Sequence, residues 1–192
     1  MQFSAALLAG GRSSRMGSDK AFLEIDGVPL WQRQLRILRE LAPAEIFIAG
    51  PSRREWLEAE AEIVPDAVTD AGPLAGLVAV LRRCSTSRLL ALAVDPPNMS
   101  SNYLTRLLSF CQPGKGVIPR SGERFEPLVA VYPVASLPLA ESLLQAGRCS
   151  LQELAIRARE HGLVVEQVIA RDDEPYFFNL NTPEDFAAAR NN

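Results

Sequence analysis

The chain has 192 residues, of which 47% are hydrophobic, and its 20 Lys plus Arg against 23 Asp plus Glu give a formal net charge of −3. This composition supports the core of one ordinary domain and excludes wholesale disorder, and the charge argues against binding nucleic acid by broad phosphate neutralisation. A single histidine and three cysteines without C-x-x-C spacing exclude a histidine metal cluster, a zinc cage and a disulfide framework.

Neither a membrane span nor a targeting segment is expected. The longest apolar stretches, such as residues 89–94, are far shorter than the roughly 18 residues that a span needs. Residues 1–4 lack the basic region of a signal peptide. We therefore expect a soluble, cytoplasmic protein with neither nucleic acid nor a membrane as a partner.

Hydrophobic runs and periodic helices alternate through the first half of the chain. The apolar runs predict strands at residues 2–8, 45–49, 60–64 and 87–94. Apolar residues from Trp31 to Leu41, at spacings of three and four, predict a helix that Pro43 ends. A second helix is predicted over residues 74–81, opening at Gly72-Pro73. Strands that are hydrophobic throughout are typical of a parallel sheet covered on both faces.

The second half is less regular but is expected to extend the same sheet. The predicted elements are strands at 116–119, 128–132 and 164–170 and helices at 137–145 and 151–159. No repeat or linker separates the halves, so residues 1–192 are predicted to form a single α/β domain, with a mostly parallel central sheet and helices on both faces. Ligands of such sheets bind beyond the carboxyl ends of the strands.

A glycine-rich loop follows the first predicted strand. Gly10 and Gly11 let backbone N–H groups approach an anion that Arg15 and Lys20 can neutralise. The spacing is neither a dinucleotide fingerprint nor a P-loop. A turn with solvated basic residues is the alternative, but Lys20 is one of only two lysines in the chain.

Two aspartates follow predicted strands. Asp95 precedes two prolines at the end of residues 87–94, where its carboxylate could bind Mg²⁺, which often takes one protein carboxylate together with substrate phosphates. The alternative is an aspartate that makes a turn before proline. Asp66 also has two possible roles: it caps a loop, or it contacts the ribose or base of a nucleotide.

Two asparagines alternate with apolar residues near the C-terminus. If residues 177–181 form a strand, Asn179 and Asn181 point to the same face. Thr182 and Asp185 predict a helix N-cap that approximates a capping box. The cap does not explain the amides of Asn179 and Asn181. The functional interpretation is that these two side chains bind the acceptor substrate.

Five segments in this order, residues 8–20, 72–76, 94–97, 126–132 and 179–185, resemble the molybdenum cofactor guanylyltransferases over nearly the whole chain. The opening loop alone is shared by the wider nucleotidyltransferase superfamily, whereas the ordered set is specific. The resemblance implies a Rossmann-like nucleotidyltransferase fold and transfer of GMP from GTP to molybdenum-bearing molybdopterin, with release of pyrophosphate.

The resemblance also implies a set of site residues. It assigns Leu8, Ala9, Gly10 and Lys20 to GTP, Asp66 to the nucleoside, and Asp95 to GTP and Mg²⁺. Lys20 and Arg15 would hold the departing pyrophosphate, and the asparagines would serve the acceptor. Family members often carry a polar residue where this chain has Gly50-Pro51. This chain therefore departs from the family at the position from which that loop would contact the nucleoside.

Other functions compete with this one. A molybdopterin cytidylyltransferase usually carries Leu-Ala-Ala-Gly in the opening loop and lacks the segment at 72–76, and sugar-phosphate nucleotidylyltransferases are usually longer. A non-catalytic nucleotide-binding protein that delivers the cofactor is a different class, against which the presence of Lys20 and Asp95 argues. The protein partners that we expect are cofactor-synthesis proteins and acceptor molybdoenzymes.

Overall fold

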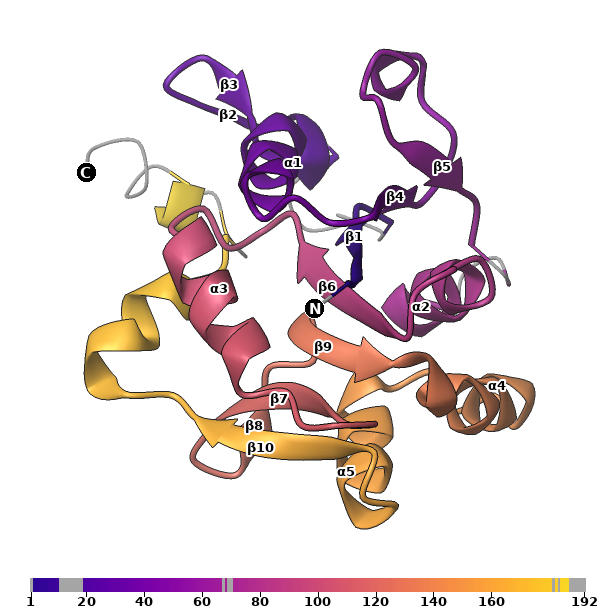
Figure 1. The fold of residues 1–192 in the computed structure, drawn as a ribbon. Helices are drawn as coiled ribbons and strands as arrows, with labels where there is room; N and C mark the ends of the chain where they lie inside the picture. The colour runs from indigo at the N-terminus through magenta and orange to yellow at the C-terminus, as the bar shows by residue number, and fades with distance from the viewer. Residues whose placement is uncertain are drawn as a thin grey trace.

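A mixed sheet runs through the middle of the molecule (Figure 1). The computed structural model describes residues 2–10, 19–66, 68, 71–180, 182 and 184–186. The strands of the sheet are β1 (Ser4–Leu8), β4 (Glu45–Ala49), β5 (Glu62–Val64), β6 (Arg88–Ala93), β7 (Gly116–Ser121), β8 (Arg124–Phe125), β9 (Val129–Pro133) and β10 (Val164–Val168). Their order is β10-β7-β9-β6-β1-β4-β5, with β8 paired to β7, while β2 (Glu24–Ile25) and β3 (Val28–Pro29) form a separate hairpin.

Strand direction determines which loops meet. β5, β4, β1 and β6 are parallel, so their carboxyl ends share one edge of the sheet. β9 is inserted antiparallel between β6 and β7 and begins at that same edge, because Val129 pairs with Leu92 near the end of β6. The loop that precedes β9 therefore lies beside the loops that follow β1 and β6.

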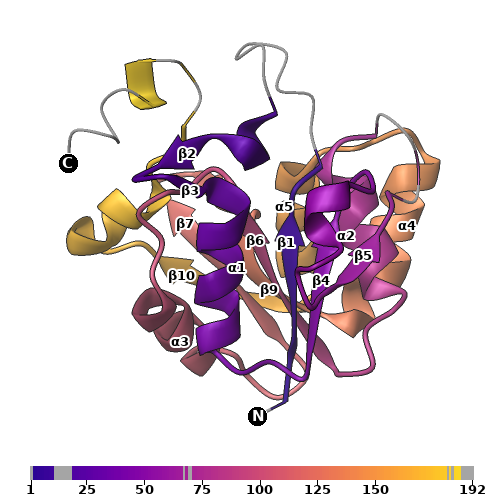
Figure 2. The same ribbon diagram turned by 90° about the horizontal axis from the view of Figure 1, so that it is seen from above.

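Helices cover both faces of the sheet, as predicted (Figures 1 and 2). α1 (Leu30–Glu40) and α3 (Ser101–Ser109) pack on one face, and α2 (Pro73–Leu81), α4 (Leu137–Gln145) and α5 (Leu151–Glu160) pack on the other. Short 3-10 helices are η1 (Lys20–Phe22), η2 (Arg54–Trp56), η3 (Val134–Ser136) and η4 (Arg171–Phe177). In the described part of the chain, no helix combines the length and apolarity that crossing a membrane requires.

Apart from the strand expected around Asn179, the predicted strands and helices are confirmed except for their exact ends, and α3 is the α-helix that was missed. Ser100 caps it, accepting a 3.2 Å hydrogen bond from the Tyr103 N–H, and Tyr103, Leu104, Leu107 and Leu108 are buried. These apolar positions follow helical spacing. The signal was thus present in the sequence, although the helix has only nine residues.

Candidate active site

A pocket of about 160 Å³ opens at the carboxyl edge of the sheet. Backbone after β1, the start of α2, and charged side chains from η1 and the loop after β6 line it. The predicted nucleotide-binding residues among its lining are Leu8, Ala9, Gly10, Lys20 and Asp95. Residues distant in sequence therefore meet where doubly wound sheets bind ligands.

Lys20 and Asp95 form an ion pair in this pocket. The Lys20 Nζ lies 3.6 Å from the Asp95 Oδ2, and the side chains are only 19% and 20% exposed. Lys20 begins η1, which Asp19 caps by accepting a 3.2 Å hydrogen bond from the Ala21 N–H. The pocket thus offers a cation and an anion together, which suits a ligand that carries phosphates and a divalent cation.

The backbone around Asp95 is held from two sides. Its carbonyl accepts a 3.1 Å hydrogen bond from the Leu180 N–H, and the next carbonyl, that of Pro96, accepts a 2.7 Å bond from the Gln34 Nε2. Gln34 is fully buried on α1. Sequence reasoning missed Gln34, although a glutamine beside the apolar positions of a helix was a signal. These contacts orient the Asp95 loop before any ligand arrives.

Asp66 follows β5, and its carboxylate lies against two glycines. A Cβ on Gly10 would come within 3.2 Å of the Asp66 Oδ2, and one on Gly76 within 3.0 Å of Oδ1. Burial raises the pKa of this carboxyl, and no hydrogen bond from a described residue lowers it. Asp66 therefore keeps its acceptor oxygens available beside the glycine loop.

Gly50 explains why a polar side chain is missing after β4. Its φ is +149°, and a Cβ there would lie 2.9 Å from the Gly10 backbone nitrogen. In this backbone a larger residue would collide with the glycine loop. The position is thus used for close packing of the two loops.

A second pocket, of about 220 Å³, adjoins the first and shares Asp95 with it. Asn179, Phe177 and Glu126 are among the residues that line it, and Asn179 is half-buried. The structure therefore brings Asn179 into a pocket next to the Lys20–Asp95 pair. Gly11, Arg15 and Asn181 lie outside the described residues.

The prediction of a strand around Asn179 is wrong. η4 ends at Phe177, and residues 178–180 pair with no strand in the described part of the chain. Leu180 is instead buried against Ile25 and Leu30 and bonds to the Asp95 backbone. One hydrogen bond and apolar packing thus replace the strand ladder, so alternation no longer determines where the amides point.

The predicted cap after this segment is confirmed. The Asp185 N–H donates to the Thr182 Oγ1 at 3.1 Å, and the Thr182 N–H donates to the Asp185 Oδ2 at 2.8 Å. These reciprocal bonds form a capping box, and residues 184–186 are helical. Thr182 therefore has a structural explanation.

Sequence reasoning also passed over Arg53, and it gave Glu126 no role of its own. An Arg53 nitrogen donates to the Asp19 Oδ2 at 2.9 Å, which ties the loop after β4 to η1. Glu126 precedes β9 and lines the second pocket. Arg53 stands in no local pattern, and Glu126 begins the family segment 126–132 without a role assigned to it, because only the strand order brings these loops to the site.

The histidine and cysteines are not placed as nucleophiles. His161 is exposed at the C-terminus of α5, while Cys84, Cys111 and Cys149 are half-buried free thiols. Burial raises the pKa of Cys84 to about 11, which keeps it a thiol. Neither the histidine nor a cysteine is among the described residues that line the two pockets of this site.

The donor set fits a divalent cation that arrives with a ligand. Among the described residues, no group of three or more His, Cys, Asp or Glu side chains could enclose a metal ion. Asp95 nevertheless lies in the pocket, and one or two carboxylates with substrate phosphates and waters are the usual ligands of Mg²⁺. Asp95 is thus the residue that would hold the ion.

A doubly wound sheet, a glycine loop after its first strand and a paired lysine and aspartate beside it are the features of a nucleotidyltransferase. Residues 5–161 match the family model of the MobA-like NTP transferase domain. The chain is similar in fold to the molybdopterin-guanine dinucleotide biosynthesis protein A of Archaeoglobus fulgidus, with a TM-score of 0.76 and 24% identity over 98% of this chain and 97% of that one. A nucleotidyl transferase from Methanothermobacter gives a TM-score of 0.79 at 21% identity, covering 99% and 96% of the two chains.

Curated relatives specify the family. The probable molybdenum cofactor guanylyltransferase of Opitutus terrae is 37% identical over 94% of this chain and 91% of its own length. The molybdenum cofactor guanylyltransferase of Pseudomonas putida is 31% identical over 94% of each. The chain belongs to the molybdenum cofactor guanylyltransferase family. The predicted resemblance, fold class and enzyme class are thereby confirmed.

Proposed function

We propose that this protein transfers GMP from GTP to molybdenum-bearing molybdopterin, forms molybdopterin guanine dinucleotide and releases pyrophosphate. The observation that carries the proposal is the Lys20–Asp95 ion pair, which lies where a pocket beside the glycine loop joins a second pocket. Two adjoining pockets suit a reaction between two substrates, and the names of the relatives agree with GTP and molybdopterin. Residues 1–192 then act as one nucleotidyltransferase domain.

The reaction needs no nucleophilic side chain. An oxygen of the molybdopterin phosphate attacks the α-phosphorus of GTP, and the bond from that phosphorus to the bridging β-phosphate oxygen breaks. The protein holds the two substrates in line and neutralises the developing charge. Lys20 and Arg15 bind the departing pyrophosphate, and the backbone of residues 8–11 contacts the triphosphate.

Mg²⁺ is the cation proposed for Asp95. When bound there, it would neutralise charge on the α- and β-phosphates. Lys20 and Asp95 hold each other at 3.6 Å in this structure, so each has an opposite charge nearby. Nucleotide binding would give both new partners, the lysine a phosphate and the aspartate the metal ion.

Asp66 is proposed to read the guanine base. Guanine presents an N1–H and a 2-amino N–H side by side, which two carboxylate oxygens can accept, whereas the corresponding edge of cytosine has one amino donor next to the acceptors N3 and O2. Gly10 and Gly76 leave the space in which this carboxylate lies. The glycine at position 10 thus serves the base site as well as the phosphate loop.

The decisive experiment compares nucleotides in turnover. We expect kcat/KM for GTP to exceed that for CTP by about 10²-fold or more, because a carboxylate placed to accept two adjacent N–H groups meets an acceptor nitrogen of cytosine in place of the second donor. The assay uses molybdenum-loaded molybdopterin and follows pyrophosphate release. Equal or greater activity with CTP would replace the proposal by a cytidylyltransferase, and nucleotide binding without turnover would indicate a delivery protein.

Asp66 should make GTP use depend on pH. Since burial raises its pKa, the carboxyl becomes protonated at a higher pH than an ordinary aspartate, and the protonated form cannot accept both N–H groups. We expect kcat/KM for GTP to be full above this raised pKa and to fall as pH decreases through it. Asp66→Asn should lower kcat/KM at neutral pH by about 10-fold or more and remove this step from the profile. An unchanged profile in the variant would exclude the base contact.

Asn179 is proposed to contact the acceptor, with Asn181 assigned beside it by the family resemblance. Asn179→Ala should raise the KM for molybdopterin by about 10-fold, the value of a lost hydrogen bond to a charged group, while the KM for GTP stays constant. Thr182→Ala is the control, because a lost cap costs about 1 kcal/mol of stability and little catalysis. If both variants lose stability alone, the segment is only structural.

The cellular setting is part of the proposal. Three free thiols suit a reducing compartment, so we assign the protein to the cytoplasm. Cofactor-synthesis proteins and acceptor molybdoenzymes are the protein partners that this reaction would require.

A further inference from the structure

Glu126 holds a carboxylate in the second pocket, on the far side of Asp95 from Asp66. It directly follows β8, and the alternation of an extended chain turns Arg124 and Glu126 to the pocket while Phe125 is buried in the core. Phe125 is 2% exposed, whereas Glu126 is half-buried. The acidic side chain is thus displayed toward a cavity.

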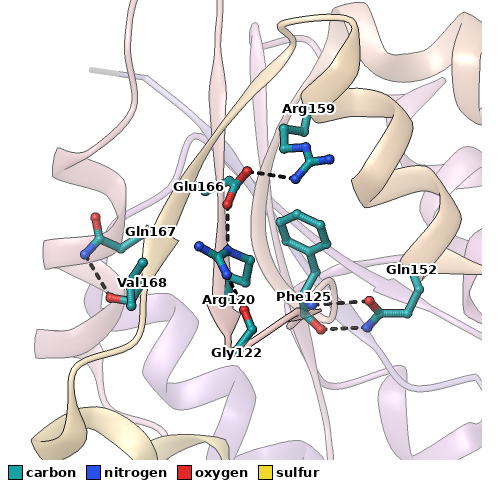
Figure 3. Close-up of polar contacts among 8 residues, drawn as sticks. All are labelled: Arg120, Gly122, Phe125, Gln152, Arg159, Glu166, Gln167 and Val168. Carbon is teal, nitrogen blue, oxygen red and sulfur yellow. Dashed lines mark hydrogen bonds and ion pairs between the residues drawn. The ribbon is translucent and has the colours of Figure 1, made fainter.

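The backbone around Glu126 is fixed at several points. The side-chain amide of Gln152 on α5 bonds to both backbone polar groups of Phe125. It accepts from the N–H at 3.2 Å and donates to the carbonyl at 2.6 Å (Figure 3). The Glu126 N–H donates to the Pro119 carbonyl at 2.8 Å, and the buried Tyr132 hydroxyl donates to the Pro127 carbonyl at 2.7 Å. A side chain on so constrained a backbone can select a ligand by geometry.

The β7–β8 hairpin, which Glu126 follows, is tied to its neighbours. Glu166 of β10 accepts from Arg120 of β7 at 2.6 Å and from Arg159 of α5 at 3.1 Å (Figure 3). Arg120 also donates to the Gly122 carbonyl in the turn.

The Glu126 carboxylate accepts no hydrogen bond from the residues that the structure describes, whereas the backbone carbonyl of the same residue accepts one of 3.1 Å from the Val129 N–H. Burial raises the pKa of its carboxyl, Arg124 lowers it and Asp95 raises it further. The neighbouring aspartate repels a second anion, so the chemistry of the pocket around Glu126 favours a ligand that brings N–H donors. Such donors would satisfy both carboxylate oxygens.

We propose that Glu126 recognises the pyrimidine edge of the pterin by accepting hydrogen bonds from its N3–H and its 2-amino group. This inference rests on the proposed function, since the pterin belongs to the acceptor substrate. With the acceptor phosphate beside Asp95, the rest of that substrate occupies the pocket that Glu126 lines. The two substrates carry the same pair of N–H donors, and the site meets each with a half-buried carboxylate, Asp66 for guanine and Glu126 for pterin.

A matched pair of small probes tests the contact. Pterin has the 2-amino group, whereas lumazine carries a carbonyl oxygen in its place, which would face the carboxylate with an acceptor. We expect fluorescence titration of the intact protein to give a Kd for lumazine at least about 10-fold above that for pterin. Glu126→Gln should weaken pterin binding by about 10-fold and remove most of this discrimination. Glu123→Gln is the control, because Glu123 is exposed in the adjacent turn.

Turnover separates this inference from the proposed function. In Glu126→Gln the KM for molybdopterin should rise by about 10-fold while the KM for GTP and the Mg²⁺ dependence stay unchanged. Absence of GMP transfer in the unmodified protein would overturn the proposed function. The pterin and lumazine titration would still test whether Glu126 contacts the pterin. No measurable binding of pterin, no discrimination against lumazine, or a variant that alters Mg²⁺ dependence instead would overturn the Glu126 assignment.

Discussion

Asp95→Asn should lower kcat by at least about 10²-fold, of the order seen when one preorganised electrostatic contact is lost in a transition state. The amide preserves the size of the side chain but removes its negative charge, so it is a weaker ligand of a hard cation than the carboxylate. The backbone bonds of this loop come from Leu180 and Gln34, which the substitution leaves in place. Steady-state turnover across a range of Mg²⁺ concentrations, with Tm measured in parallel, checks the expectation.

A matched carboxylate controls for the loss of charge alone. Asp26 lies in the turn between β2 and β3 with its side chain 76% exposed, and its φ of +55° is one that asparagine tolerates. Asp26→Asn should therefore leave kcat unchanged. Near-normal turnover with ordinary Mg²⁺ dependence in Asp95→Asn would mean that Asp95 is a turn former.

Lys20→Ala should reduce kcat/KM for GTP by roughly 10- to 100-fold, which corresponds to the ~1.5–3 kcal/mol attributed to a hydrogen bond with a charged group. The substitution removes the cation proposed for the triphosphate and also leaves Asp95 without its 3.6 Å partner. Both GTP affinity, measured by titration, and the transfer rate should decrease.

Lys115 supplies the comparison because it is the only other lysine. It directly precedes β7, at the opposite edge of the sheet from the pocket. Lys115→Ala should change neither GTP affinity nor turnover. Equal losses in the two variants would indicate a general effect of positive charge instead of a site.

Local patterns in the sequence were sufficient to determine the alternation of strands and helices and the glycine loop after the first strand. A buried strand or an amphipathic helix is specified by residues within a few positions of each other, so its signal survives without tertiary contacts. The ordered segments from the opening loop to the capping box at Thr182 also determined the family, and the comparisons agree.

The tertiary structure decided which of these residues share a site and what supports them. Gln34 reaches the Asp95 loop across 62 sequence positions, and Glu126 comes beside Asp95 because β9 is inserted antiparallel next to β6. Asn179 lies in an irregular segment because the Leu180 side chain finds a buried site at the hairpin. Each of these depends on strand order and long-range packing, for which residues adjacent in the chain carry no periodic signal.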